Sequence, residues 1–228
     1  MTITRLEIPD VLLISPTVFG DARGYFLESF RADKLAEFGV TAQFVQDNMS
    51  SSTRNVVRGL HYQKDPYAQG KLVRVIEGEV FDVAVDIRAD SPWYGRWVGR
   101  LLSAENKESM YVPPGFAHGF CVVSETAQFH YKCTGYYAPE YERSVLWRDA
   151  ALGIDWPVSA DEAILSEKDA TAPVLAVADN TYVYTEGAAG RVGISANSRH
   201  VKSNLKPMGV GRVLTTKVNA NIGTISVR

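Results

Sequence analysis

Short stretches of alternating apolar and polar residues, separated by turn residues, constrain the fold of this chain more than any other feature of its sequence. Residues 81–87 (FDVAVDI) and 128–133 (QFHYKC) alternate with a period of two, which predicts half-buried β-strands. Shorter apolar runs, such as 110–112, are bounded by Pro and Gly. Helical periodicity is limited to 31–38 and a short stretch at 166–170. The pattern predicts an all-β sandwich or closed barrel with a few short helices, whose mouth can hold a ligand.

The charge of the chain changes sign near its end. Residues 1–180 carry 17 Lys/Arg and 25 Asp/Glu, whereas residues 181–228 carry 7 Lys/Arg and 1 Asp/Glu. The second segment also lacks Trp and Phe and is rich in Gly, Asn, Ser and Thr. We therefore expect one domain at 1–180 and an appended, loosely ordered, non-catalytic tail at 181–228. The tail lacks the interleaved aromatic residues of a base-stacking surface, so we expect no nucleic-acid partner.

Composition also bounds the cellular location. The sequence has no run of 18 apolar residues, and its first 16 residues lack the charged start and apolar stretch of a signal peptide. The two cysteines, Cys121 and Cys133, lack the spacing of a zinc site or a disulfide framework. These observations predict a soluble cytoplasmic protein that does not associate with membranes.

A histidine, an arginine and a lysine stand in the β-patterned segment that runs from residue 56 to residue 76. Polar groups such as Arg58, His61 and Lys71 are uncommon in strands unless they are paired or functional. The three residues would suit a base, a cation for an anion, and a cation for a developing oxyanion. An ordinary surface hairpin would explain the segment equally well.

Two further polar side chains favour a functional site. Tyr131 shares a strand face with Phe129, and His118 follows a Pro-Pro-Gly turn. Either residue alone is explained as a buried polar group with one hydrogen-bond partner. Convergence of both with His61 and Lys71 on one barrel interior is difficult to explain by chance, and it favours catalysis.

Six motifs carry a resemblance to a known family. They are residues 19–24 (FGDARG), 44–48 (FVQDN), 58–63 (RGLHYQ), 70–74 (GKLVR), 112–120 (VPPGFAHGF) and 165–169 (LSEKD). Their order and spacing resemble those of the dTDP-4-dehydrorhamnose 3,5-epimerases from about residue 3 to about residue 178. The resemblance implies a cupin-type double-stranded β-helix (jelly roll) and a homodimer with exchange of an N-terminal strand. It also implies an isomerase that converts dTDP-4-dehydro-6-deoxy-D-glucose to dTDP-4-dehydro-L-rhamnose.

The resemblance also assigns catalytic roles to four residues. The C4 ketone of this substrate acidifies the hydrogens on C3 and C5, so epimerisation through an enolate needs no cofactor. The resemblance implies that His61 is the base, that Asp169 orients it, and that Tyr131 is the acid on the opposite face. Lys71 would hold the ketone oxygen as negative charge develops there.

The family's substrate-binding positions match ten residues of this chain. They are Arg23, Glu28, Gln46, Asn48, Arg58, Lys71, His118, Tyr137, Glu142 and Lys168. Guanidinium groups suit diphosphate oxygens, and Tyr137 offers a stacking face for thymine. Strand exchange would place Arg23 and Glu28 at the neighbour's site. Arg58 and His61 have opposite parity on an ideal strand, and we expect a bulge at Gly59 to absorb the difference.

Three alternatives remain open from the sequence. A metal-binding cupin would carry a His-x-His pair with a nearby Glu, but residues 61–63 read His-Tyr-Gln, so we expect no metal. A sugar-nucleotide-binding cupin without full activity, or an epimerase that inverts a single carbon, would carry most of the same residues. Tail residues 205–211 (LKPMGVG) and 216–224 (TKVNANIGT) resemble part of phosphomethylpyrimidine synthase. No activity follows from that match, because the tail contains no cysteine for the iron–sulfur cluster of that enzyme.

Overall fold

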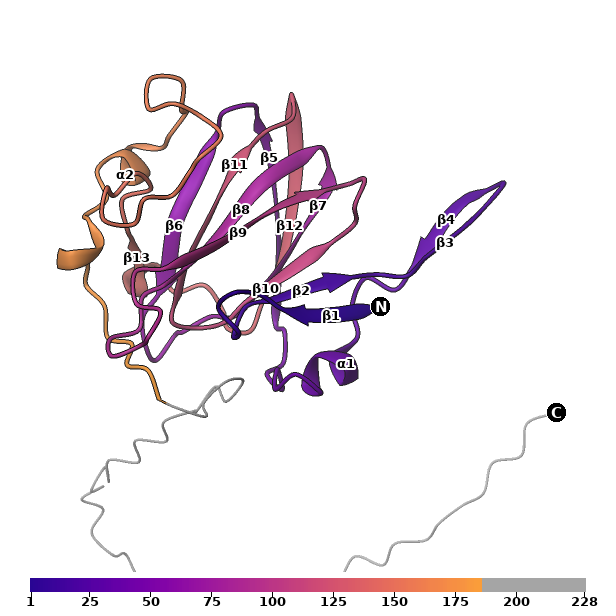
Figure 1. Cartoon of the computed structure of the whole chain (residues 1–228), viewed down its shortest axis with the longest axis horizontal. Helices are drawn as coiled ribbons and strands as arrows, with labels where there is room; N and C mark the ends of the chain where they lie inside the picture. The colour runs from indigo at the N-terminus through magenta and orange to yellow at the C-terminus, as the bar shows by residue number, and fades with distance from the viewer. Residues whose placement is uncertain (186–228) are drawn as a thin grey trace, which may run out of the picture. The chain divides into compact units, whose positions relative to one another are not determined.

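Two antiparallel sheets form the body of the fold within residues 1–185, which are the residues that the computed structural model describes (Figure 1). In sheet order, the six-stranded sheet consists of β1 (Thr2–Arg5), β2 (Leu12–Ser15), β10 (Ser109–Val112), β7 (Lys71–Glu77), β12 (Thr126–Cys133) and β5 (Gln46–Thr53). The five-stranded sheet consists of β13 (Glu142–Ser144), β6 (Val57–Gln63), β11 (Phe116–Val122), β8 (Glu79–Asp86) and β9 (Trp97–Ser103). The predicted all-β, cupin-type jelly roll is confirmed.

The main hydrophobic core lies between the two sheets. Phe129 of β12 and Phe120 of β11 stack with their ring centroids 4.2 Å apart. Val73 and Val75 of β7, together with Leu102 of β9, complete the centre of this core and are at most 1% exposed. Val73 and Val75 lie two positions apart on β7, so they share the inward face, as the period of two predicts. A polar side chain that takes an inward position must then face either this core or a cavity beside it.

Strand β6 contains a bulge at Gly59. His61 pairs with His118 of β11 and Arg58 pairs with Phe120, so β6 holds one residue more than β11 between these two pairs. Gly59 has a φ of 120°, and a Cβ at this position would lie 2.6 Å from the Cα of Gly119. Only glycine fits such a close approach of two backbones. The predicted bulge is confirmed, and Arg58 and His61 both line one cavity.

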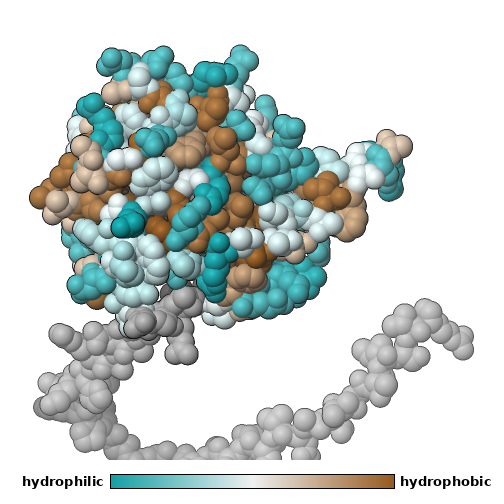
Figure 2. Space-filling model, viewed as in Figure 1, coloured by the Kyte–Doolittle hydropathy of each residue, from teal (hydrophilic) through white to brown (hydrophobic). Residues whose placement is uncertain are grey.

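The N-terminal part of the chain forms a hairpin and a short helix outside the two sheets. Strands β3 (Val18–Asp21) and β4 (Gly24–Leu27) project away from the sheets (Figure 1). Three of the hairpin's aromatic side chains, Phe19, Tyr25 and Phe26, are more than 60% exposed, and apolar atoms reach its surface (Figure 2).

Both predicted helices are present. Helix α1 spans Ala32–Ala36, and helix α2 spans Glu167–Ala170 with Ser166 as its N-cap. Two short 3₁₀ helices, at Pro139–Tyr141 and Leu175–Val177, complete the elements. In the described part of the chain, no helix is long and apolar enough to cross a membrane.

The chain stays in contact with the loop after β8 as far as Tyr184. The backbone N–H of Tyr184 donates to Ala89, and its ring stacks on the guanidinium of Arg88. The domain boundary predicted near residue 180 thus falls within a packed segment. The loosely ordered tail expected at 181–228 lies almost entirely outside the described residues.

Candidate active site

Two cavities open between the sheets and share His61, Lys71 and Tyr131 as lining residues. The larger cavity has a volume of about 670 Å³, and the smaller one about 310 Å³. The larger cavity is also lined by Ser50, Val56, Val57, Arg58, His118, Phe120, Phe129, Ile164, Leu165, Ser166, Lys168 and Asp169. The smaller cavity is also lined by Gln46, Asn48, Tyr62, Gln63, Gln69, Cys133, Tyr137 and Glu142. The four residues expected to converge on the interior therefore line the larger cavity.

His61 of β6 forms a close pair with Asp169 of α2. The distance from His61 Nε2 to Asp169 Oδ1 is 2.5 Å. Ser166 accepts a hydrogen bond from the backbone N–H of Asp169, and this N-cap fixes the short helix that presents the carboxylate. Burial lowers the pKa of His61 below its ordinary value, although Asp169 opposes that shift. Burial raises the pKa of Asp169, but the hydrogen bonds and charges of its neighbours, His61 foremost, together outweigh burial and leave the pKa lowered. His61 is therefore neutral near pH 7 and able to accept a proton.

Lys71 and Tyr131 face His61 from the other sheet. They lie on the neighbouring strands β7 and β12, with the Lys71 ammonium 6.0 Å from the centroid of the Tyr131 ring. Burial lowers the pKa of Lys71 and raises the pKa of Tyr131. Neither Lys71 Nζ nor the Tyr131 hydroxyl forms a hydrogen bond within residues 1–185. Both groups are thus available to a ligand.

A second histidine–carboxylate pair borders the larger cavity. His118 Nε2 lies 3.0 Å from both carboxylate oxygens of Asp82 on β8, which is fully buried. Burial raises the pKa of Asp82, while His118 opposes that shift. Sequence reasoning missed Asp82. Its signal was a carboxylate at an inward position of an apolar strand, where a buried charge requires a partner.

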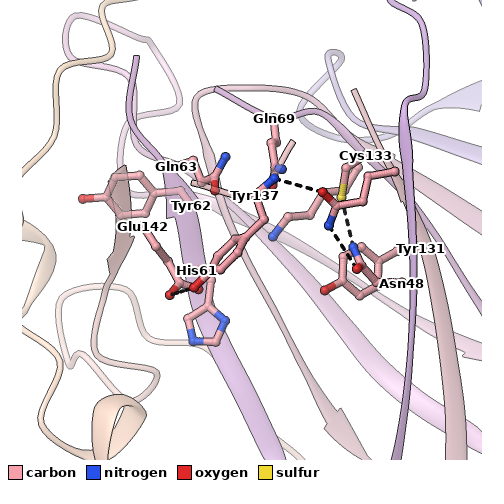
Figure 3. A pocket seen from close by; sticks show the side chains of 11 residues that line it. Asn48, His61, Tyr62, Gln63, Gln69, Tyr131, Cys133, Tyr137 and Glu142 are labelled. Carbon is pink, nitrogen blue, oxygen red and sulfur yellow. Dashed lines mark hydrogen bonds between the residues drawn. The ribbon is translucent and has the colours of Figure 1, made fainter. Parts of the chain in front are cut away.

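Tyr137 and Glu142 organise the smaller cavity (Figure 3). The Tyr137 hydroxyl donates to Glu142 Oε2 over 3.0 Å, and the Lys168 ammonium lies 3.0 Å from Glu142 Oε1. The backbone N–H of Tyr137 donates to Gln46 Oε1 over 2.9 Å, and Gln46 donates in turn to Asn48. Five of the predicted binding residues are therefore joined in one hydrogen-bonded group.

The three remaining binding residues with charged side chains are placed differently. Arg58 lines the larger cavity, and its Nε donates to Ser52 over 3.1 Å. Arg23 lies at the tip of the projecting hairpin with a side chain that is 90% exposed. Glu28 lies 3.7 Å from Arg31 and lines neither cavity. The structure does not bring Arg23 and Glu28 to the cavities of the same chain, so their role at a neighbour's site stays a prediction.

Several further side chains of the site have no role that was predicted from the sequence. Ser166, Gln63, Gln69 and Cys133 line the cavities, and Ser52 holds Arg58. Gln63 was visible as the last residue of the motif at 58–63, but a buried glutamine reveals its partners only in three dimensions. In residues 1–185, no group of three His, Cys, Asp or Glu side chains is arranged to hold a metal ion.

Known proteins match both the sequence and the fold. The sequence model of the dTDP-4-dehydrorhamnose 3,5-epimerase family matches residues 5–177. The enzyme of that name from Pseudomonas aeruginosa is 57% identical over 180 residues, which are 78% of this chain and 98% of that protein. A crystal structure of dTDP-6-deoxy-D-glucose-3,5-epimerase from Legionella pneumophila in complex with dTDP-4-keto-L-rhamnose is similar with a TM-score of 0.77 and 50% identity, covering 81% of this chain and 98% of that one. A 3'-monoepimerase from Streptomyces bikiniensis in complex with dTDP-quinovose has a TM-score of 0.71 and 35% identity, covering 75% of this chain and 86% of that one. The chain belongs to the dTDP-4-dehydrorhamnose 3,5-epimerase family.

Proposed function

We propose that this protein converts dTDP-4-dehydro-6-deoxy-D-glucose to dTDP-4-dehydro-L-rhamnose by inverting C3 and C5 of the sugar. One observation carries the proposal. His61 of the five-stranded sheet, paired with Asp169 of α2, faces Lys71 and Tyr131 of the six-stranded sheet across the larger cavity. Inversion at a carbon needs a base on one face of the ring and an acid on the other, and the two sheets supply one each.

His61 removes the proton in this mechanism. Its Nε2 carries the hydrogen that bonds to Asp169, so Nδ1 is left as the basic nitrogen. The C4 ketone makes the adjacent C–H bonds acidic, because the carbanion is delocalised onto oxygen as an enolate. Asp169 stabilises the imidazolium that forms when His61 has accepted the proton.

Lys71 and Tyr131 complete the reaction from the opposite side. The Lys71 ammonium stabilises the enolate oxygen, and its partly buried location strengthens that interaction relative to bulk water. The raised pKa of Tyr131 keeps its hydroxyl protonated, so it can deliver a proton to the face away from His61. His118, held by Asp82, supplies a further hydrogen bond to the sugar or its ketone.

The nucleotide occupies the smaller cavity in this proposal. Tyr137 stacks on thymine there, and Gln46 and Asn48 make neutral polar contacts. Arg58 and Lys168 line the adjoining larger cavity and approach the diphosphate from that side. The complex of the Legionella relative with dTDP-4-keto-L-rhamnose supports a dTDP-sugar as the ligand. The reaction of such a substrate through an enolate needs no cofactor. We also propose that the enzyme is cytoplasmic.

We further propose that two copies form a homodimer by exchanging their N-terminal strands. The projecting β3–β4 hairpin exposes Phe19, Tyr25 and Phe26, which a second copy would cover. Exchange would bring Arg23 and Glu28 to the partner's site. The family resemblance stated above supports this arrangement.

Deuterium incorporation tests the reaction. The purified protein is incubated with the 4-keto sugar nucleotide in deuterated water, and NMR locates deuterium on the sugar ring. We expect deuterium at both C3 and C5 together with the L-lyxo product. Deuterium at C3 alone would instead support the single-carbon alternative, which the similar 3'-monoepimerase represents. Binding without any exchange would leave only a sugar-nucleotide-binding protein.

A further inference from the structure

Gln63, the last residue of the motif at 58–63, has a position in the structure that the proposed mechanism does not use. It ends strand β6, lines the smaller cavity and is only 5% exposed. We propose that Gln63 is a positioning residue that fixes Tyr137 over the smaller cavity and thereby sets the affinity for the nucleotide. The inference rests on the proposed function, since it takes that cavity as the nucleotide site.

The Gln63 side chain binds the main chain on both sides of Tyr137. Its Oε1 accepts from the backbone N–H of Ala138 over 2.7 Å, and its Nε2 donates to the carbonyl of Tyr136 over 3.2 Å. The same amide nitrogen donates to the carbonyl of Tyr67 over 2.6 Å. One buried amide therefore satisfies three backbone groups in two separate segments. Only an amide offers both an acceptor and two donors in one plane for this purpose.

Tyr137 needs such support because packing does not hold it. Tyr137 is 52% exposed, and within residues 1–185 its hydrogen bonds run only to Gln46 through the backbone and to Glu142 through the hydroxyl (Figure 3). Glu142 lies opposite Gln63 in the β13–β6 ladder. The Gln63 side chain thus fixes the backbone around Tyr137. The strand that contains Gln63 also pairs with the strand of Glu142, which binds the Tyr137 hydroxyl. A ring held in advance loses less conformational freedom when a base stacks on it.

The segment after residue 177 binds the main chain of Gln63 and the side chains of its two neighbours. The Tyr182 hydroxyl donates to the carbonyl of Gln63, and the Tyr62 hydroxyl donates to the carbonyl of Asp179 over 2.9 Å. The Asp179 carboxylate also lies 2.5 Å from the Lys64 ammonium. Three consecutive residues at the end of β6 are therefore tied to a segment that lies beyond the family match, which ends at residue 177.

The test measures binding of dTDP itself, by calorimetry, and turnover of the dTDP-sugar by the full-length protein. We expect Gln63→Met to weaken dTDP binding and raise KM about tenfold while kcat stays within about twofold, because the groups around the reacting carbons keep their places. Gln128→Met is the matched control. Gln128 bonds to Glu77 and lines neither cavity, and we expect it to leave both parameters unchanged.

A double-mutant cycle separates positioning from general destabilisation. In a Tyr137→Ala background, Gln63→Met should cause no further loss of dTDP affinity, because the ring that Gln63 positions is absent. Tyr182→Phe removes only the hydrogen bond from the Tyr182 hydroxyl to the Gln63 carbonyl. It should weaken dTDP binding about threefold, again only when Tyr137 is present. It supplies the test should Gln63→Met fail to fold.

The outcomes are distinct. Additive effects of Gln63→Met and Tyr137→Ala, a matching fall in kcat, or unchanged dTDP affinity in both Gln63→Met and Tyr182→Phe would overturn the inference and leave the proposed function standing. Failure of the unmodified protein to bind dTDP would overturn the proposed function and this inference together.

Discussion

The two sheets prepare their functional side chains in opposite ways. On the five-stranded sheet, His61 and His118 are each bonded to a carboxylate, at 2.5 Å and 3.0 Å. On the six-stranded sheet, Lys71 and Tyr131 line the same cavity, but their polar atoms bond to no other group in residues 1–185. One wall of the cavity is therefore paired and the other is unpaired.

The difference follows from what each group must do. A histidine base needs a defined tautomer and orientation before substrate arrives, and a carboxylate partner supplies both. A cation for an enolate and a proton donor gain their effect from bonds made to the reacting atoms, so a protein partner would compete with the substrate. Burial lowers the pKa of both His61 and Lys71. Asp169 opposes that shift through a direct hydrogen bond to His61, whereas Glu142 and Asp82 oppose it in Lys71 only through their charge.

Removing the base from the paired wall has the largest expected effect. His61→Asn should lower the rate of deuterium exchange at C3 and C5 by roughly 10³-fold, because the amide of Asn cannot accept the proton as the imidazole does. NMR in deuterated water measures the loss, and circular dichroism checks that the fold is intact. Exchange at the unmodified rate would show that His61 is not the base.

Replacing Lys71 tests the unpaired wall. Lys71→Met keeps the length of the side chain but removes the charge, and we expect kcat to fall about a hundredfold to a thousandfold with a smaller change in KM. The variant should also be no less stable to urea, since Lys71 bonds to no protein group in the described chain and its burial as a cation is costly. A strongly destabilised Lys71→Met protein would show that Lys71 has a structural partner after all.

Tyr131→Phe should separate two steps of the reaction. The base can still remove a proton and return it on its own face, so exchange should persist within a few-fold while inverted product falls roughly a hundredfold. The measurement compares deuterium content with product stereochemistry in the same sample. Equal losses of exchange and inversion would assign Tyr131 to binding or ketone polarisation instead.

The sequence predicted the inward residues of this site better than it predicted their partners. Strand periodicity and motif order located His61, Lys71, His118 and Tyr131, since these depend on local pattern and resemblance. The bulge at Gly59 was predictable for the same reason. Asp82 and Gln63 act through contacts between segments far apart in the chain, and Ser52 reaches Arg58 from the preceding strand. No period-two pattern reports such contacts.

The pH dependence of the rate tests how the paired wall tunes its base. Burial lowers the pKa of His61 below its ordinary value of about 6.5, and the protonated form cannot act as a base. In a plot of kcat/KM against pH, activity should therefore be retained at pH 6.5 and fall only at lower pH. Asp169 raises the His61 pKa, whereas Lys168 and Lys71 lower it. Asp169→Asn should then move this fall to still lower pH, besides lowering the plateau. A fall that stays at the same pH would belong to another group.

The smallest expected effect comes from shortening the chain, which compares the packed segment before residue 185 with the sequence that follows. Every residue that lines the two cavities precedes residue 170, the family match ends at 177, and the described contacts end at Tyr184. A chain ending at Thr185 should therefore fold and keep kcat and KM within about twofold of the full protein.

A chain ending at Ala178 loses Asp179 and Tyr182, the two residues that hold Gln63 and its neighbours. Its KM should rise severalfold while kcat is retained. Steady-state kinetics of the two shortened chains and the full protein measures both effects. A fall of more than about tenfold in kcat/KM for the chain ending at Thr185, which corresponds to about 1.4 kcal/mol of transition-state stabilisation, would make residues 186–228 part of the enzyme.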